Sequence, residues 1–161
     1  MRSIDALPKL KGTTVVLVDV SGSMDAPLAK KSDMSRIDAA AMLGCMIDGA
    51  RVFSFSNQLV EVPAYKGLAG VEAVVRSQPH SGTAMASAID IAQTRYKADR
   101  IIVISDEQAT DGRVVAPMAY PYRYMINVAS YKNGVGYGAW THIDGFSENV
   151  IRYIHELENA E

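Results

Sequence analysis

The chain has 161 residues, of which 48% are hydrophobic and 21% are charged, and its 16 basic and 18 acidic residues leave a formal net charge of −2. This length and composition are typical of a single folded domain and argue against a disordered chain. The charge balance lacks the excess of Lys and Arg by which proteins neutralise phosphates, so we expect no direct nucleic-acid binding by this domain alone.

The cysteine content and the length of the apolar runs bear on the compartment. Cys45 is the only cysteine, so the chain forms no internal disulfide and no cysteine-based zinc site. The N-terminus lacks the apolar core of a signal peptide, and no apolar run is long enough to cross a bilayer. These features predict a cytoplasmic protein with no membrane association.

Strand-like and helix-like segments alternate along the chain. Residues 1–12, which include Pro8 and Gly12, are expected to form a lead-in or linker before a single domain of residues 13–161. Strands are predicted at apolar, β-branched runs, and helices where apolar residues recur at a helical period or follow a cap. The expected strands are 13–19, 50–55, 59–62, 100–105, 124–128 and 140–143, and the expected helices are 35–48, 71–75, 83–96 and 147–158.

Two of these helices carry specific packing predictions. Ser35 with Asp38 matches a capping box, and the helix after it is apolar nearly all round, so we expect it to be buried. The last helix is expected to point its apolar side chains at the core, with Phe146 packing against one of them as a hydrophobic staple. The inward-facing residues would be Val150, Ile151, Ile154 and Leu157.

The connections between the predicted strands indicate the type of sheet. The connection 56–58, between the second and third strands, is too short for a crossover and permits only an antiparallel pair. The alternation of strands and helices around it predicts an α/β fold. We expect a doubly wound, mostly parallel, Rossmann-like sheet with one antiparallel edge strand and helices on both faces, a three-layer α/β/α arrangement.

Oxygen-bearing side chains gather at three predicted element ends. The first strand ends at Asp19, and the Val-Ser-Gly-Ser that follows places Ser21 and Ser23 at alternate positions. Thr83 opens a helix after His-Ser-Gly, and Asp106 follows the fourth predicted strand. The carboxyl ends of parallel strands share the sheet edge where open α/β sheets hold ligands. Hard cations such as Mg²⁺ prefer oxygen ligands, so these residues predict a metal site.

Together, Asp-x-Ser-x-Ser, Ser-Gly-Thr and Ser-Asp in this order resemble the von Willebrand factor type A (vWA) domain. The five residues match, position by position, that family's metal-ion-dependent adhesion site (MIDAS), and the likeness covers nearly the whole chain. It implies that Ser21, Ser23 and Thr83 coordinate Mg²⁺, with Mn²⁺ or Ca²⁺ as alternatives. It further implies that Asp19 and Asp106 contact the ion directly or through water.

The same resemblance implies a function. Two carboxylates and three hydroxyls leave the ion short of a ligand, so a Glu or Asp of a partner protein would complete its shell. The chain would then be a protein-binding module rather than an enzyme, and we expect it to be a monomer. The residues expected on the rim that faces the partner are Lys30, Lys31, His80 and Glu107.

A narrower likeness concerns residues 10–24 and 144–151. Leu-Lys-Gly-Thr-Thr-Val-Val-Leu-Val-Asp-Val-Ser-Gly-Ser-Met and Asp-Gly-Phe-Ser-Glu-Asn-Val-Ile look like the C-terminal vWA domain of Ro-type (TROVE) RNA-binding proteins. In that family a ring of helical repeats binds RNA, and this sequence contains no such ring. The likeness therefore implies an accessory domain of a Ro/TROVE-type ribonucleoprotein, without transferring RNA binding to this chain.

Three other interpretations fit parts of the pattern. Asp19 and the serines after it could form a polar turn that bonds nearby backbone and holds no metal. Ser21 or Ser23 could serve a metal-assisted hydrolase of the phosphatase or esterase type, which would need a histidine partner. A nucleotide-binding role is only weakly indicated, because the glycines of 131–138 open no evident helix. The available histidines are His80, His142 and His155.

Overall fold

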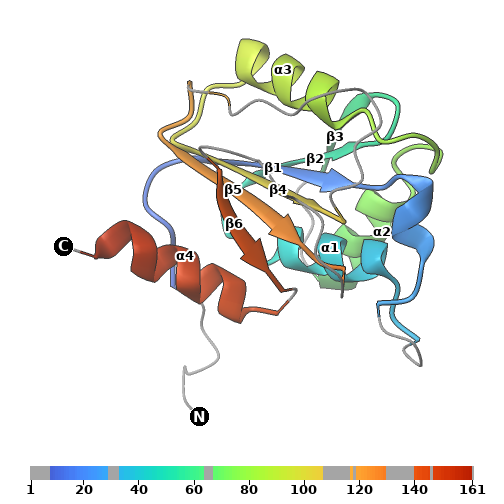
Figure 1. Cartoon of the computed structure of the whole chain (residues 1–161), viewed down its shortest axis with the longest axis horizontal. Coiled ribbons are helices and arrows are strands. Elements are labelled where there is room, and N and C mark those ends of the chain that lie inside the picture. The colour runs from blue at the N-terminus through green and yellow to red at the C-terminus, as the bar shows by residue number, and fades with distance from the viewer. Residues whose placement is uncertain are drawn as a thin grey trace.

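A computed structural model describes residues 8–28, 33–63, 67–106, 117, 119–129, 140–145 and 147–160. Their backbone forms one six-stranded sheet with helices on both faces (Figure 1). The strands are β1 (Thr14–Asp19), β2 (Arg51–Phe55), β3 (Leu59–Val62), β4 (Arg100–Ser105), β5 (Tyr122–Asn127) and β6 (Thr141–Asp144). The helices are α1 (Arg36–Cys45), α2 (Gly67–Val75), α3 (Met85–Arg95) and α4 (Asn149–Asn159), and a 3-10 helix, η2 (Gly22–Asp25), follows β1.

The strand order is β3-β2-β1-β4-β5-β6, and each neighbouring pair is parallel except β2 with β3. This confirms the doubly wound sheet with one antiparallel edge strand. The central strands β1 and β4 are buried along their whole length, as expected of apolar runs covered on both faces. The chain order reverses between β1 and β4, so their carboxyl ends flank the position where open α/β sheets hold ligands.

The helices form the two outer layers that were predicted. α3 covers one face of the sheet, and α1, α2 and α4 cover the other (Figure 1). Alternate residues of β1 serve the two sides: Leu17 packs in the core under α3, and Val16 and Val18 pack in the core under α1. The three-layer α/β/α arrangement is therefore confirmed.

α1 has the predicted cap and lies close to the sheet. The Ser35 hydroxyl accepts a hydrogen bond from the Asp38 N–H at 3.2 Å and donates one to the Asp38 carboxylate at 2.9 Å. Gly44 permits the close approach, because a Cβ there would lie 3.1 Å from Cγ2 of Val18. Most of the helix is buried, as predicted, but Met42 on its outer side is 37% exposed.

Several element ends differ from the sequence prediction. α1 ends at Cys45, short of the expected residue 48, and α2 begins at Gly67 rather than at Val71. The Gly-Leu-Ala-Gly that opens α2 has poor intrinsic helix propensity, so sequence alone favoured a later start. β5 begins two residues earlier than predicted, because Tyr122 pairs with Arg100 of β4.

α4 buries three of the four apolar residues predicted to face the core, Val150, Ile151 and Ile154. The prediction for Leu157 is wrong, since that side chain is 40% exposed. The inward position at this turn belongs to Glu158, whose carboxylate accepts a hydrogen bond of 2.7 Å from Nε of the buried Arg100. Phe146, the predicted staple, lies outside the described residues.

Residues 8–12, the described part of the predicted lead-in, contact the folded domain. Leu10 packs against the core under α1, and the Lys11 carbonyl accepts a hydrogen bond of 2.8 Å from Nη2 of Arg100. The division of the chain after residue 12 remains a prediction.

None of the helices in the described ranges is both long enough and apolar enough to cross a membrane.

Candidate metal centre

The carboxyl end of β1 fixes the first predicted ligands. Asp19 is fully buried; its Oδ1 accepts a hydrogen bond from the Ser21 N–H at 2.8 Å, and its Oδ2 accepts one from the Ser105 hydroxyl at 2.7 Å. The first bond is the local turn expected of an Asp at a strand end. The turn brings Oγ of Ser21 to 3.4 Å from Oγ of Ser23.

The charge on Asp19 is costly in this environment. Burial raises the pKa of Asp19 from 3.8 to about 6, and the nearby charge of Asp106 acts in the same direction. Hydrogen bonds from Ser21 and Ser105 favour the carboxylate and limit the rise. A hard cation bound between these two buried carboxylates and the neighbouring hydroxyls would stabilise the charged form of both carboxylates.

The loop that carries Thr83 is fastened to the ends of β1 and β2. The Gly22 N–H of η2 donates a hydrogen bond of 2.9 Å to the Ser81 carbonyl. The Ser56 hydroxyl, just after β2, accepts from the Ser81 N–H at 2.8 Å and donates to the Gly82 carbonyl at 2.9 Å. Thr83 itself is only 4% exposed. The loop is thus held next to the segment that follows Asp19.

The end of β4 contributes a carboxylate that is paired with a cation. The Asp106 side chain is fully buried, and its Oδ2 lies 3.0 Å from Nη1 of Arg36, the first residue of α1. The same Nη1 donates to the Ser23 carbonyl at 3.4 Å. The Arg36 guanidinium therefore lies between η2 and the end of β4.

The structure brings the three segments that carry the five predicted ligands to one edge of the sheet. Four of these side chains are buried, and Ser23 is half-buried. In the part of the chain that the structure describes, no group of three or more His, Cys, Asp or Glu side chains could hold a metal. A cation at this edge would therefore depend on hydroxyl as well as carboxylate oxygens, and the assignment of the five ligands remains a prediction.

Comparison with known proteins gives the fold. No protein-family model matches the chain, and no curated protein matches it in sequence. Among solved structures, an aerotolerance-related membrane protein from Bacteroides fragilis is 16% identical with a TM-score of 0.65, over 91% of this chain and 97% of that one. BatB from Bacteroides thetaiotaomicron is 17% identical with a TM-score of 0.61, over 89% of this chain and 95% of that one.

The Ro (RSR) protein of Deinococcus radiodurans is 20% identical with a TM-score of 0.66, over 91% of this chain. The match covers 34% of the Ro protein, so this chain spans about a third of its length. The chain has the fold of a vWA domain. At these identities the likeness establishes the fold alone, and confirms what the sequence pattern predicted for it.

Of the four residues predicted on the rim of this vWA-like domain, only His80 is described, and Lys30, Lys31 and Glu107 lie outside the described residues. The His80 Nε2 lies 2.7 Å from the Val75 carbonyl oxygen, and its Nδ1 lies 3.0 Å from Oδ1 of Asp25. Both ring nitrogens are therefore engaged away from the serines that follow Asp19.

Histidine geometry also bears on the hydrolase interpretation. His142 lies in β6, at the far edge of the sheet from β1, and His155 lies in α4. Since His80 is bonded to Asp25 and Val75, no described histidine forms a Ser–His pair with Ser21. Among the described residues, Ser21 therefore has no histidine partner of the kind that activates a serine nucleophile.

Three contributors to the site were missed at the level of sequence: Arg36, Ser56 and Ser105. Ser105 stands beside Asp106 in the Ser-Asp pair, and Ser56 was assigned to a simple turn. The only signal for Arg36 is its position, because a cation in the first turn of a helix opposes the helix dipole and needs another reason to be there.

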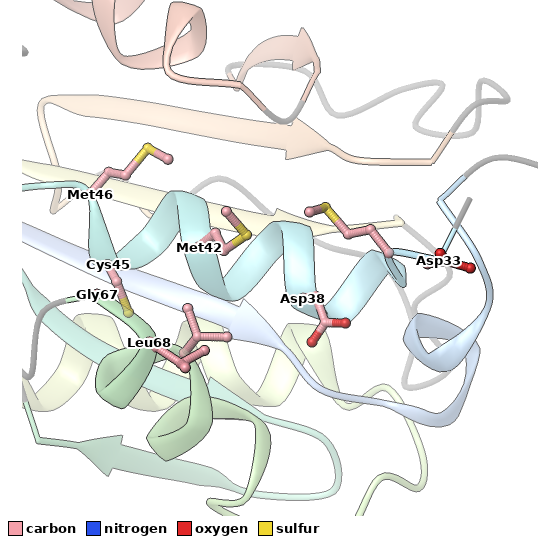
Figure 2. A pocket seen from close by; sticks show the side chains of 9 residues that line it. Asp33, Asp38, Met42, Cys45, Met46, Gly67 and Leu68 are labelled. Atoms are coloured by element: carbon pink, nitrogen blue, oxygen red, sulfur yellow. The ribbon is translucent and has the colours of Figure 1, made fainter. Parts of the chain in front are cut away.

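Away from the candidate metal centre, the vWA-like domain has a groove lined by residues of α1 and α2, with a volume of about 660 Å³ (Figure 2). Its walls are mostly apolar, Leu68 is 74% exposed beside it, and the Cys45 side chain points toward Leu68. The sequence did not predict this groove, because α1 was expected to be buried on all sides. Its lining is Asp33, Met34, Asp38, Met42, Cys45, Met46, Gly67, Leu68 and Val71.

Proposed function

We propose that this vWA-like domain is a metal-ion-dependent protein-binding module. The observation that carries the proposal is the gathering of two buried carboxylates, Asp19 and Asp106, with hydroxyl side chains at the carboxyl edge of a vWA fold. vWA-like domains as a class mediate protein interactions, which gives the site a use. Mg²⁺ is the expected ion, with Mn²⁺ or Ca²⁺ as alternatives.

The residues have distinct parts in this proposal. Ser21, Ser23 and Thr83 would supply neutral oxygens to the ion, and Asp19 and Asp106 would supply negative charge directly or through water. When bound, the ion would offer a coordination position to a Glu or Asp carboxylate of the partner protein. The hydrogen bonds that hold Asp19 and the Thr83 loop would keep these ligands oriented before the ion arrives.

The proposal extends to the setting of the domain. The match to the Deinococcus radiodurans Ro protein supports a role as an accessory domain of a Ro/TROVE-type ribonucleoprotein. We place the domain in the cytoplasm as a monomer that contacts a protein partner rather than nucleic acid, in keeping with its net charge of −2.

Calorimetric titration of the EDTA-treated protein with Mg²⁺ and Mn²⁺ tests the metal site. We expect binding by the wild type and its loss in Ser21→Ala and Thr83→Ala. Ser147→Ala, which changes an exposed serine before α4, is the matched control and should bind like the wild type. Undiminished ion binding by both site variants would contradict the assignment of these ligands.

The partner chemistry is tested by selecting peptides from a random displayed library on the immobilised domain. We expect Mn²⁺-dependent enrichment of peptides that contain Glu or Asp, with release by EDTA and no enrichment on Ser21→Ala. Selection of the same peptides in Mn²⁺ and in EDTA would remove the metal from the recognition mechanism.

The alternative function, a metal-assisted hydrolase, is tested with chromogenic phosphate and acetate esters. A binding module should give no turnover above background with Mn²⁺ present. Turnover that Asp19→Ala abolishes in a folded protein would replace the binding module by an enzyme.

A further inference from the structure

Arg36 is a cation placed among the groups proposed to bind a metal. Its Nη1 lies 3.0 Å from Oδ2 of Asp106 and 3.4 Å from the carbonyl oxygen of Ser23. The Arg36 side chain is 13% exposed and the Asp106 side chain is fully buried, so solvent screens this pair little. The Arg51–Glu61 pair differs, with side chains 52% and 45% exposed.

The helix that carries Arg36 does not account for the choice of an arginine. Arg36 is the first residue of α1, where the helix dipole favours acidic side chains and disfavours basic ones. The hydrogen-bonding needs of this helix end are served by Ser35 and Asp38. The contact with Asp106 supplies the missing reason for a guanidinium at this position.

A guanidinium and a divalent cation beside the same carboxylate repel one another, because like charges at short range in a poorly screened site interact strongly. Without a metal, the Arg36 charge offsets one of the two negative charges of Asp19 and Asp106. We propose that Arg36 is an internal counter-ion that stabilises the metal-free site and lowers its affinity for a divalent cation. This inference rests on the proposed function and concerns how the same site is regulated.

Coupling between the two cations is reciprocal. If Arg36 weakens metal binding, a bound metal must weaken the Arg36–Asp106 interaction by the same factor. Half-occupancy of the site would then require a higher free cation concentration than it would without Arg36. Arg36 is in this sense a residue that sets affinity, not a ligand.

The test compares EDTA-treated wild type with Arg36→Gln, which removes the charge but keeps a polar side chain. We expect the variant to bind Mn²⁺ about tenfold more tightly by calorimetry, within the range usual for coupled binding events. We also expect the variant to be less stable than the wild type to urea in EDTA, with the difference shrinking in saturating Mn²⁺. The second readout measures the counter-ion role without any partner protein.

Two control variants separate charge from geometry. Arg36→Lys keeps the charge and loses the planar fork of the guanidinium, so its Mn²⁺ affinity should stay close to that of the wild type. Arg51→Gln removes the same charge from the exposed pair at the amino end of β2, away from the site, and should leave Mn²⁺ affinity unchanged.

The outcomes distinguish this inference from the proposed function. Equal or weaker Mn²⁺ binding by Arg36→Gln, with wild-type binding intact, overturns the counter-ion role alone. Binding by Arg36→Gln but not by the wild type supports the counter-ion role and contradicts metal-dependent function of the natural chain. Absence of binding in both overturns both.

A stability failure of the variant would still be informative. If Arg36→Gln is unfolded in EDTA, circular dichroism during a Mn²⁺ titration replaces calorimetry. Refolding driven by Mn²⁺ supports the counter-ion role, because the metal then replaces the missing positive charge. Failure of Mn²⁺ to restore the fold overturns it.

Discussion

The hydroxyl of Ser105 donates a hydrogen bond of 2.7 Å to Oδ2 of Asp19, and both residues are fully buried. The bond joins the last residues of the neighbouring central strands β4 and β1. The bond therefore both helps to hold the two strands together and fixes the orientation of the Asp19 carboxylate at the candidate metal centre.

Replacement of Ser105 by Ala tests this link. A hydrogen bond to a charged group contributes about 1.5–3 kcal/mol, so we expect Ser105→Ala to lower the free energy of unfolding by that amount. Urea denaturation at neutral pH measures the loss. The control Glu156→Ala, at an exposed position of α4, should stay within about 0.5 kcal/mol of the wild type. A fully stable Ser105→Ala would show that the Ser21 N–H alone suffices for Asp19.

The pH dependence of stability follows from the pKa of Asp19, which burial raises from 3.8 to about 6. Between these values the folded protein binds a proton more readily than the unfolded chain, so Asp19 makes the metal-free protein more stable as the pH falls through this window. One pK unit corresponds to about 1.4 kcal/mol, so the gain is on the order of 3 kcal/mol.

Urea unfolding of wild type and Asp19→Asn in EDTA, at several pH values between about 4 and 7, isolates this contribution. The variant cannot titrate at this position, so its stability relative to the wild type should be greatest near neutral pH and should decline as the pH falls. A difference that does not change with pH would show that the Asp19 pKa is unperturbed.

The hydrogen bonds of Ser56 predict an effect at a distance from the ion. Ser56→Ala removes the hydroxyl that holds Ser81 and Gly82, and hence the loop that positions Thr83. We expect Mn²⁺ affinity to fall about tenfold, as is typical when a residue that orients a ligand is removed. Ser77→Ala is the matched control: the Ser77 hydroxyl donates to the Val74 carbonyl, outside that loop, so Mn²⁺ affinity should be retained.

The ion pair between Arg100 of β4 and Glu158 of α4 should contribute strongly to the stability with which α4 packs on the sheet. Arg100 is fully buried, so Glu158→Ala would leave its charge without the carboxylate that also accepts a hydrogen bond of 2.8 Å from the Tyr124 hydroxyl. Breaking such a buried pair typically costs about 3–5 kcal/mol. Urea denaturation should show this loss, and Glu156→Ala on the exposed side of α4 should change little. Equal stability of the two variants would contradict it.

Much of the fold could be predicted because most segments with an apolar sequence pattern occupy buried positions in the fold. β1 and β4 are uninterrupted apolar runs that end in a carboxylate or a serine next to one, and they are buried as such runs should be. The prediction that Leu157 faces the core failed because an acidic residue, not an apolar one, faces inward at this turn. An inward-facing position in α4 is acidic because a buried arginine in another element requires a carboxylate, which helical periodicity cannot reveal.

For the candidate site, residue types and spacing predicted that three element ends would meet, and the structure brings those ends to one edge of the sheet. The assignment of Asp19, Ser21, Ser23, Thr83 and Asp106 as ligands stays a prediction. Arg36 was not identified, because its contact with Asp106 spans 70 positions in the sequence and depends on how closely α1 approaches the sheet. Gly44 permits that approach, because a Cβ there would lie 3.1 Å from Cγ2 of Val18, and this contact can be recognised only once the helix is placed on β1.

Arg100 donates hydrogen bonds both to the carbonyl of Lys11 and to the carboxylate of Glu158. Segments that are distant in the chain therefore meet on one guanidinium. A recombinant fragment that starts at Thr13 would remove the Lys11 carbonyl, and one that stops before Glu158 would remove the carboxylate. In either case the buried Arg100 guanidinium would lose a hydrogen-bond acceptor. Shortened versions of this protein should be cut outside both residues.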